Sequence, residues 1–179
     1  MMTTEFCATQ DSVRTMSRHE AEAWLFREAR LIDEYRLHDW LALFADDGLY
    51  WAPIDDRQAP GTTVALIHDT SLRRRERVYR LLETQAHAQD PLSRTQHVVG
   101  NVEVEPAGDG EVRVFSSQIV YEIRAGLADY RQLGLGEQRS FAARCEHRLR
   151  WQDGQWKIAL KKMLLLNRDI AIENLTFIL

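Results

Sequence analysis

The chain has 179 residues, which is enough for one well-buried core but short for two ordinary domains. Its 45% hydrophobic and 28% charged residues are typical of globular proteins, and its net charge of -4 argues against a nucleic-acid-binding protein. Cys7 and Cys145 fit no metal or disulfide pattern, and we find neither an export signal nor an apolar segment long enough for a membrane. We therefore expect a cytoplasmic protein with reduced thiols that binds neither nucleic acid nor membranes.

The first helix is predicted to begin after a polar segment. Residues 1–16 are expected to form a flexible N-terminal arm, so the domain is assigned to residues 17–179. Ser17 and Glu20 have the spacing of a capping box at a helix start. One side of this helix is apolar and carries Ala21, Trp24, Leu25, Leu31, Ile32 and Tyr35.

Glu28 lies in the middle of this apolar face, where an ionised carboxylate is costly unless it is paired. One interpretation is a general acid or base at the floor of a pocket. The other, which we favour, is a buried ion pair with an arginine. The candidate partners are Arg94, Arg144 and Arg148.

The next segment predicts a helix that turns directly into a strand. Residues 37–45 form a short helical pattern whose buried side is Trp40, Leu41 and Phe44, and the sequence "DDGLYWAP" follows it. A desolvated Asp46 or Asp47 could act as a general base. We favour a structural role for both, because Asp and Gly supply the turn chemistry that such a corner needs.

A third helix is predicted by "DTSLRRRERVYRLLE", residues 69–83, after the short apolar run "TVALIH". Its apolar positions are Leu72, Val78, Tyr79 and Leu82, and its arginines are Arg73, Arg74, Arg75, Arg77 and Arg80. One interpretation of these arginines is a phosphate-binding helix. Interleaved glutamates and the absence of an aromatic platform favour a solvated or subunit-facing surface instead.

From residue 94 onward the pattern alternates as in β-strands. "HVVGNVEVE" and "EVRVFSSQIVYEIR" flank a hairpin turn, and "FAARCEHRLRW" is joined by "DGQ" to "WKIALKKMLLL". In "FAARCEHRLRW", Cys145 and His147 lie on one face of the predicted strand, and Arg144 and Arg148 lie on the other. Helices followed by long antiparallel strands predict an α+β domain in which a strongly curved, mainly antiparallel β-sheet packs against N-terminal helices.

We find no self-contained catalytic or metal-binding motif. The six histidines show no metal-ligand spacing, and "CEH" lacks further obvious ligands. Phosphate-binding loops, dinucleotide fingerprints and a nucleophile elbow are absent from the sequence, and no His–Asp pair is evident. We therefore assign no catalytic, cofactor-binding or metal-binding residue to this chain.

Three segments in this order resemble the small, or β, subunit of bacterial aromatic-ring-hydroxylating dioxygenases. They are "LFREARLIDEYRLHDWLALFADDGLYWAPI", "DPLSRTQHVVGNVEVE" and "NRDIAIENLTFIL". The residues that we take as its structural motif are Glu28, Asp46, Asp47, Ser93, Arg94, Thr95 and Asn101.

The resemblance implies a cone-shaped fold similar to nuclear transport factor 2 (NTF2-like, or cystatin-like). It implies a partner, the large (α) oxygenase subunit, in an α3β3 hexamer that contains a homotrimer of β subunits. In such enzymes a Rieske [2Fe-2S] cluster and a mononuclear Fe(II) lie in the α subunit, which performs cis-dihydroxylation of an arene with electrons from NAD(P)H via a reductase. The β subunit would then have a structural and assembly role in aromatic compound catabolism.

Two hypotheses follow, a structural dioxygenase subunit and an autonomous NTF2-like lyase or isomerase for a small hydrophobic substrate. The first is favoured by the family-specific segments. Candidate residues for the subunit interface are Arg73, Arg77, Arg80, Leu175, Phe177, Ile178 and Leu179. For Leu175, Phe177, Ile178 and Leu179, the alternative to a subunit interface is that the C-terminal tail folds back on the sheet of its own chain.

Overall fold

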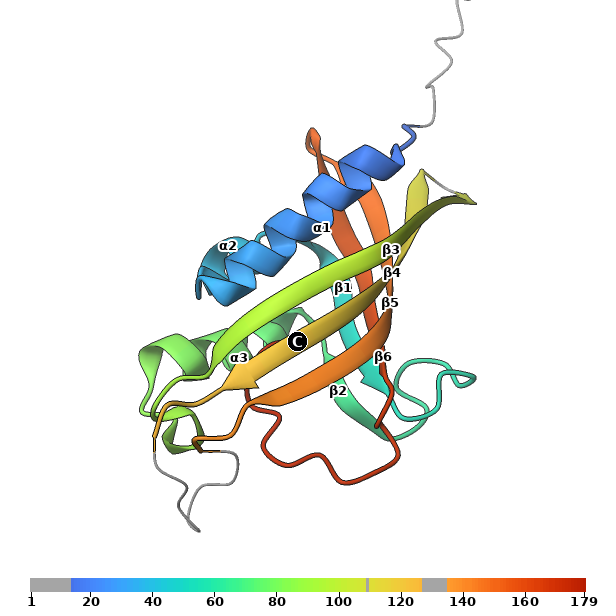
Figure 1. Ribbon diagram of the computed structural model, residues 1–179. Helices are drawn as coiled ribbons and strands as arrows, with labels where there is room; N and C mark the ends of the chain where they lie inside the picture. The colour runs from blue at the N-terminus through green and yellow to red at the C-terminus, as the bar shows by residue number, and fades with distance from the viewer. Residues whose placement is uncertain (1–13, 109, 127–134) are drawn as a thin grey trace, which may run out of the picture.

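The alternating runs of the C-terminal half form four long strands in the computed structural model, which describes residues 14–108, 110–126 and 135–179 (Figure 1). They are β3 (Arg94–Gly108), β4 (Glu111–Ile123), β5 (Arg139–Gln152) and β6 (Gln155–Leu165). Each of these strands pairs antiparallel with the next. Cys7 and most of the predicted N-terminal arm lie outside the described residues.

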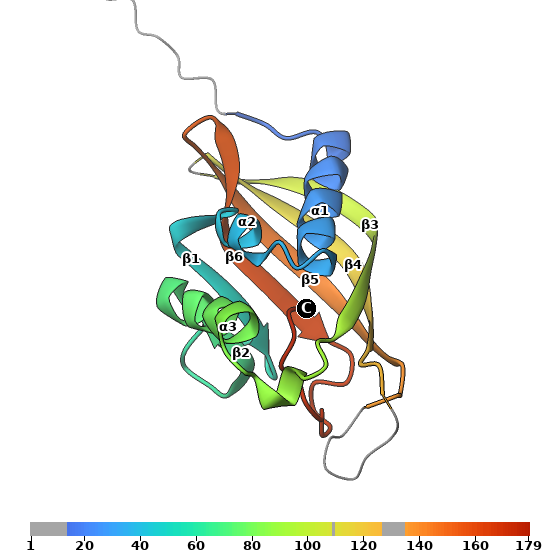
Figure 2. The same cartoon turned by 90° about the vertical axis from the view of Figure 1, so that its left-hand side faces the viewer.

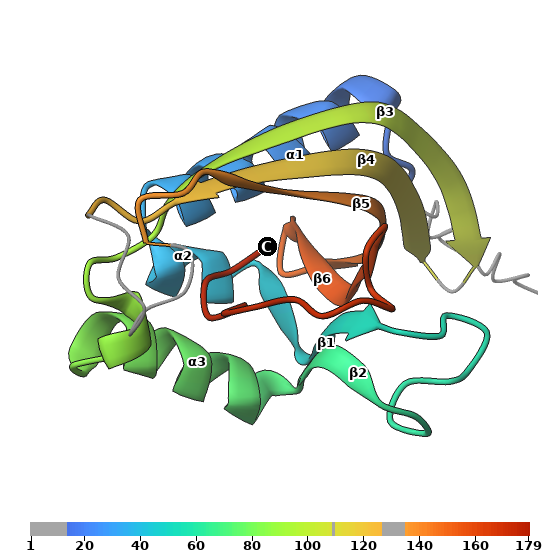
Figure 3. The same cartoon turned by 60° about the horizontal axis from the view of Figure 1, so that its bottom comes forward.

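Two shorter strands complete the sheet. β1 (Phe44–Pro53) pairs in parallel with β6, and β2 (Ala65–Asp69) pairs antiparallel with β1. The strand order is β2-β1-β6-β5-β4-β3, and the sheet curves strongly around its helices and the C-terminal segment (Figure 3). The predicted α+β class with a curved, mainly antiparallel sheet is confirmed.

The first helix, α1 (Arg18–Asp33), begins at the predicted capping box. The hydroxyl of Ser17 accepts a hydrogen bond from the Glu20 amide at 3.2 Å, and the Glu20 carboxylate accepts one from the Ser17 amide at 2.8 Å. The helix lies inside the curve of the sheet, alongside β3 (Figure 2). Its buried positions are Ala21, Leu25, Glu28, Ala29, Leu31 and Ile32.

The second helix is shorter than predicted. α2 spans Leu37–Leu41, and β1 has already begun at Phe44. The amide of Ile158 in β6 donates to the Leu43 carbonyl at 2.8 Å, so pairing with β6 overrides the local helical pattern. Trp40 and Phe44 are nonetheless buried, as predicted.

The third helix, α3 (Ser71–Glu83), turns inward only part of the predicted apolar set, because Val78 is buried and Leu82 packs against the core but Leu72 and Tyr79 do not. Leu72 and Tyr79 are 66% and 59% exposed, whereas Val78 and Leu81 are buried together with Arg74. The Arg74 guanidinium donates to the carbonyls of Gly48 and Asp69 and lies 4.0 Å from the centre of the Phe44 ring. These contacts allow an arginine to fill an inward position of the helix. A short 3-10 helix, η1 (His87–Gln89), follows.

The segment after β6 folds back into the concave side of the sheet. Its end lies near the centre of the molecule in all three views (Figures 1, 2 and 3). Phe177, Ile178 and Leu179 are 0–2% exposed and belong to the same core cluster as α1 and the strands. Burial within their own chain accounts for their apolar character, in place of the expected contact with another subunit. In the part of the chain that the structure describes, no helix is long and apolar enough to cross a membrane.

Candidate functional site

Glu28 forms a buried polar cluster with side chains from three other elements. One carboxylate oxygen accepts hydrogen bonds from Lys161 Nζ at 3.0 Å and from Trp40 Nε1 at 3.2 Å. The other lies 2.9 Å from His147 Nε2. Glu28 is 3% exposed, so the predicted burial holds, but the expectation of an arginine partner is wrong: the charged partner is Lys161, beside His147.

The strand geometry explains why no arginine reaches Glu28. Alternation along β5 turns His147 inward, whereas Arg144 and Arg148 are exposed on the opposite face, and Arg94 in β3 is also exposed. On β6, Ile158 pairs with Leu149 and Leu160 pairs with Arg148, so Ala159 is an extra residue. This bulge changes which positions face inward, and it is the reason that Lys161 points at Glu28.

The cluster holds Glu28 in its ionised form. Burial alone would raise the pKa of Glu28, but the Lys161 ammonium and His147, which also hydrogen-bond to the carboxylate, keep the pKa well below its ordinary value. Lys161 Nζ donates a further hydrogen bond to the Leu179 carbonyl at 2.9 Å. The Tyr50 hydroxyl lies 3.2 Å from both the amide nitrogen and the carbonyl oxygen of Leu179.

The C-terminal residue Leu179 therefore lies directly beside Lys161, on the inner side of the sheet. The cavity left between Ile32, Leu81 and the tail residues Phe177 and Ile178 is about 10 Å³. This volume is close to the minimum that a single water requires. Glu28, His147 and Lys161 do not line this cavity and are each at most 3% exposed, so the cluster lies within the packed core.

A His–Asp pair is present, contrary to our expectation from the sequence. His97 Nδ1 on β3 lies 2.6 Å from Asp33 Oδ1 at the end of α1, and the amide of His97 donates to Asp33 Oδ2 at 2.9 Å. The hydroxyl of Thr95 also donates to Asp33, at 2.8 Å. Burial raises the pKa of Asp33, but the hydrogen bonds and charge of His97 outweigh it and lower the pKa. Both carboxylate oxygens are used to fasten α1 to the edge strand β3.

Of the other motif residues, Ser93 also fastens this edge of the sheet. Ser93 is 1% exposed; its hydroxyl donates to Glu122 at 2.6 Å and its carbonyl accepts from the Tyr35 hydroxyl at 2.7 Å. Asn101 has a φ of 53° in the irregularity of β3 between Gly100 and Glu103, a conformation that Asn adopts more readily than most residues. The side chain of Arg94 is exposed.

Asp46 and Asp47 are exposed on β1, away from the buried cluster. They lie in a bulge, because Phe44 pairs with Ile158 and Leu49 pairs with Leu160, leaving four residues on β1 opposite one on β6. Asp47 pairs with Arg150 at 3.1 Å. The structure therefore places both carboxylates in a strand bulge, where we expected a helix-to-strand turn.

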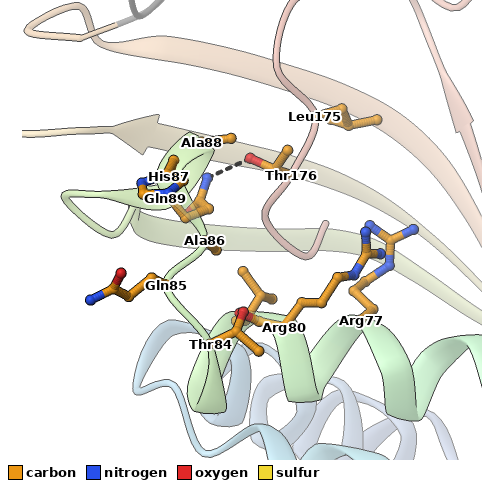
Figure 4. A pocket seen from close by; sticks show the side chains of 11 residues that line it. Arg77, Arg80, Thr84, Gln85, Ala86, His87, Ala88, Gln89, Leu175 and Thr176 are labelled. Atoms are coloured by element: carbon orange, nitrogen blue, oxygen red, sulfur yellow. Dashed lines mark hydrogen bonds between the residues drawn. The ribbon is translucent and has the colours of Figure 1, made fainter.

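The interface candidates on α3 line a groove on the surface. Arg77 and Arg80 line it from α3, residues 86–89 line it from the η1 side, and Leu175 and Thr176 line it from the C-terminal segment (Figure 4). Arg77 Nε is 2.5 Å from Asp69 Oδ2. Arg73 lines an adjacent hollow that Arg77 and Arg80 share. In residues 14–108, 110–126 and 135–179, no group of three or more His, Cys, Asp or Glu side chains is placed to hold a metal ion.

The sequence comparisons with known proteins point to one family. Residues 27–171 match the family model described as "Ring hydroxylating beta subunit". The small oxygenase component of the p-cumate 2,3-dioxygenase system of Pseudomonas putida is 37% identical over 163 residues, which cover 88% of this chain and 84% of that protein.

Solved structures show the same fold. The β subunit of benzoate 1,2-dioxygenase from Burkholderia mallei has a TM-score of 0.71 at 23% identity, covering 92% of this chain and 99% of that one. An NTF2-like protein with a cystatin-like fold from Novosphingobium aromaticivorans has a TM-score of 0.53 at 16% identity, covering 84% and 82%. The predicted NTF2-like fold is confirmed.

Proposed function

Because the chain belongs to the ring-hydroxylating dioxygenase β-subunit family, we propose that it is the structural, non-catalytic β subunit of a terminal oxygenase in aromatic compound catabolism. The observation that carries this proposal is the family match over residues 27–171. The buried Glu28 cluster supports it, because a general acid or base must come within hydrogen-bonding reach of a substrate. Here the tail residue Leu179 occupies that position.

The chemistry is assigned to the large subunit. The Rieske [2Fe-2S] cluster and the mononuclear Fe(II) would lie there and, when reduced by NAD(P)H through a reductase, would carry out cis-dihydroxylation of an arene. This chain would hold the large subunits in place. We further propose that residues 17–179 act as one domain, that the chain forms a homotrimer within an α3β3 hexamer, and that the complex is cytoplasmic.

The alternative is an autonomous NTF2-like lyase or isomerase. The fold by itself permits it, since the same architecture supports unrelated functions. A substrate at the Glu28 cluster would require the C-terminal segment to leave the concave side. The 10 Å³ cavity beside Phe177 and Ile178 argues against a substrate there.

The test is to produce the chain with and without a large oxygenase subunit, and then to assay each with NADH, electron-transfer proteins and an arene. p-Cumate is the first substrate to try, because of the 37% identity to the small component of the p-cumate system. We expect copurification of the two subunits and arene dihydroxylation with the pair, and no turnover with this chain alone. Stoichiometric iron in the isolated chain, or dihydroxylation without the large subunit, would contradict the proposal.

A further inference from the structure

The groove between α3, η1 and residues 175–176 carries positive charge, although the protein as a whole has a net charge of -4. Arg77 and Arg80 line it, and both extend from α3 toward the C-terminal segment (Figure 4). Because they are three positions apart on a helix, they lie on the same face as neighbours. His87 is the other ionisable side chain of the lining, which includes no Asp or Glu among the described residues.

The two arginines have unused hydrogen-bond donors. Arg77 Nε is paired with Asp69, but the two terminal nitrogens of Arg77 make no hydrogen bond with any residue that the structure describes. The side chain of Arg80 is exposed and has neither a hydrogen bond nor an ion pair within the described part of the chain. Glu76 lines the adjacent hollow and is not paired with Arg80. Asp69 compensates one of the two charges, so one positive charge and several N–H donors are left for a ligand.

Beside the arginines, the groove has an apolar flank. Leu81, Leu175 and Ala86 contribute to it, and Leu81 is fixed in the core with an exposure of 7%. The Gln89 side chain donates to the Thr176 hydroxyl at 2.7 Å, which ties η1 to the C-terminal segment (Figure 4). The volume of the groove is about 490 Å³, which lies within the usual range of small-molecule sites. The groove therefore combines a charged end with an apolar wall.

We propose that this groove binds a small organic carboxylate with a compact apolar body, the carboxylate on Arg80 and Arg77 and the body against Leu81 and Leu175. A guanidinium matches the two oxygens of a carboxylate bidentately. A monoanion suits the single uncompensated charge better than a phosphate ester, which carries about 1.5 to 2 negative charges at neutral pH. A bare inorganic anion would leave the apolar flank unused. This inference goes beyond the proposed function and does not rest on it.

The experiment titrates the full chain with benzoate and follows its amide signals by NMR. Benzamide has the same ring without the charge, acetate has the carboxylate without the ring, and inorganic phosphate is an anion of a different kind. The titrations are repeated with Arg80→Gln and Arg75→Gln. Arg75 is a matched control, because it is exposed on the same helix but lines neither the groove nor the adjacent hollow. Circular dichroism melts show that each variant is folded.

Benzoate should bind with a dissociation constant on the order of 1 mM or below and should shift the amide signals of residues 84–89 and 175–176. Benzamide and acetate should each bind at least about tenfold more weakly, because each lacks one half of the recognition. Arg80→Gln should weaken benzoate binding about tenfold, and Arg75→Gln less than about twofold.

Three results would overturn the proposal. The first is an equal effect of the two substitutions, or benzamide binding as tightly as benzoate. The second is phosphate binding more tightly than benzoate, which would indicate an inorganic-anion site. The third is the loss of benzoate binding when the titration is repeated on a complex with a copurifying large subunit, because the groove would then be a subunit contact.

Discussion

At the scale of single residues, Glu28 links four elements through one carboxylate. It receives hydrogen bonds from Trp40 on α2, from His147 on β5 and from Lys161 on β6. Glu28 and Lys161 are both essentially inaccessible to solvent, so each charge depends on the other for compensation. Substituting only one of these two residues should therefore lower the free energy of unfolding more than substituting both.

Glu28→Ala is expected to lower the free energy of unfolding by roughly 3 to 5 kcal/mol, because it leaves the Lys161 ammonium buried without its partner. The double substitution Glu28→Leu with Lys161→Met removes both charges at similar volume and should cost less than Glu28→Ala. Urea denaturation of the three proteins measures these differences. A double variant that loses as much stability as Glu28→Ala, or more, would contradict this mutual dependence of the two charges.

The same cluster predicts a dependence of stability on pH. The pKa of Glu28 is lowered in the folded protein, so its contribution is fully present above the ordinary value of about 4.5 and is lost as the pH falls below it. Unfolding measured between pH 7 and pH 3.5 should show a stability loss on acidification that is smaller in Glu28→Gln. If the wild-type protein and Glu28→Gln lost the same stability on acidification, the pH dependence would not come from Glu28.

At the scale of elements, bulges determine which side chains meet. The extra residue Ala159 in β6 turns Lys161 inward, and the bulge in β1 places Asp46 and Asp47 on the surface. The β1 bulge also brings Gly48 against β6. A Cβ at this position would overlap the backbone oxygen of Ile158 and lie 3.0 Å from that of Ala45.

Gly48→Ala should therefore destabilise the fold by roughly 1 to 3 kcal/mol, because the atom it would strike belongs to the backbone of a paired strand. Asp46→Asn, two positions away and exposed, is the control and should change stability by less than about 0.5 kcal/mol. Thermal unfolding of both variants measures the difference. A Gly48→Ala protein as stable as Asp46→Asn would mean that β1 and β6 separate easily at this point.

At the scale of the whole molecule, the C-terminal segment takes part in the core. Phe177 packs against Phe141 with ring centres 5.4 Å apart and is 1% exposed. The concave side of the sheet is thus filled by the chain itself. This arrangement suits a subunit whose task is to support a catalytic partner.

Phe177→Ala should cost roughly 3 to 5 kcal/mol, because it removes a large buried side chain and leaves a cavity. Leu166→Ala, in the same segment but 66% exposed, should change stability by less than about 0.5 kcal/mol. Denaturant unfolding measures both values. Similar small losses for the two variants would indicate that the tail is not part of the core.

The sequence by itself determined the features that depend on local pattern or on family resemblance. The capping box placed the start of α1, alternation put His147 and Arg144 on opposite faces of one strand without deciding which face is inward, and the three quoted segments identified the family. These could be predicted because helix caps and strand periodicity are encoded by residues close together in the chain.

The tertiary structure alone decided which residues face each other across the core. Lys161 meets Glu28 across 133 positions of sequence and only because of the bulge at Ala159; His97 meets Asp33 across 64 positions. Pairing with β6 ended α2 early, and packing drew Phe177 inside the sheet. Such contacts depend on strand register and on the space between elements, and a single extra residue in a strand reverses the face that a periodic pattern assigns.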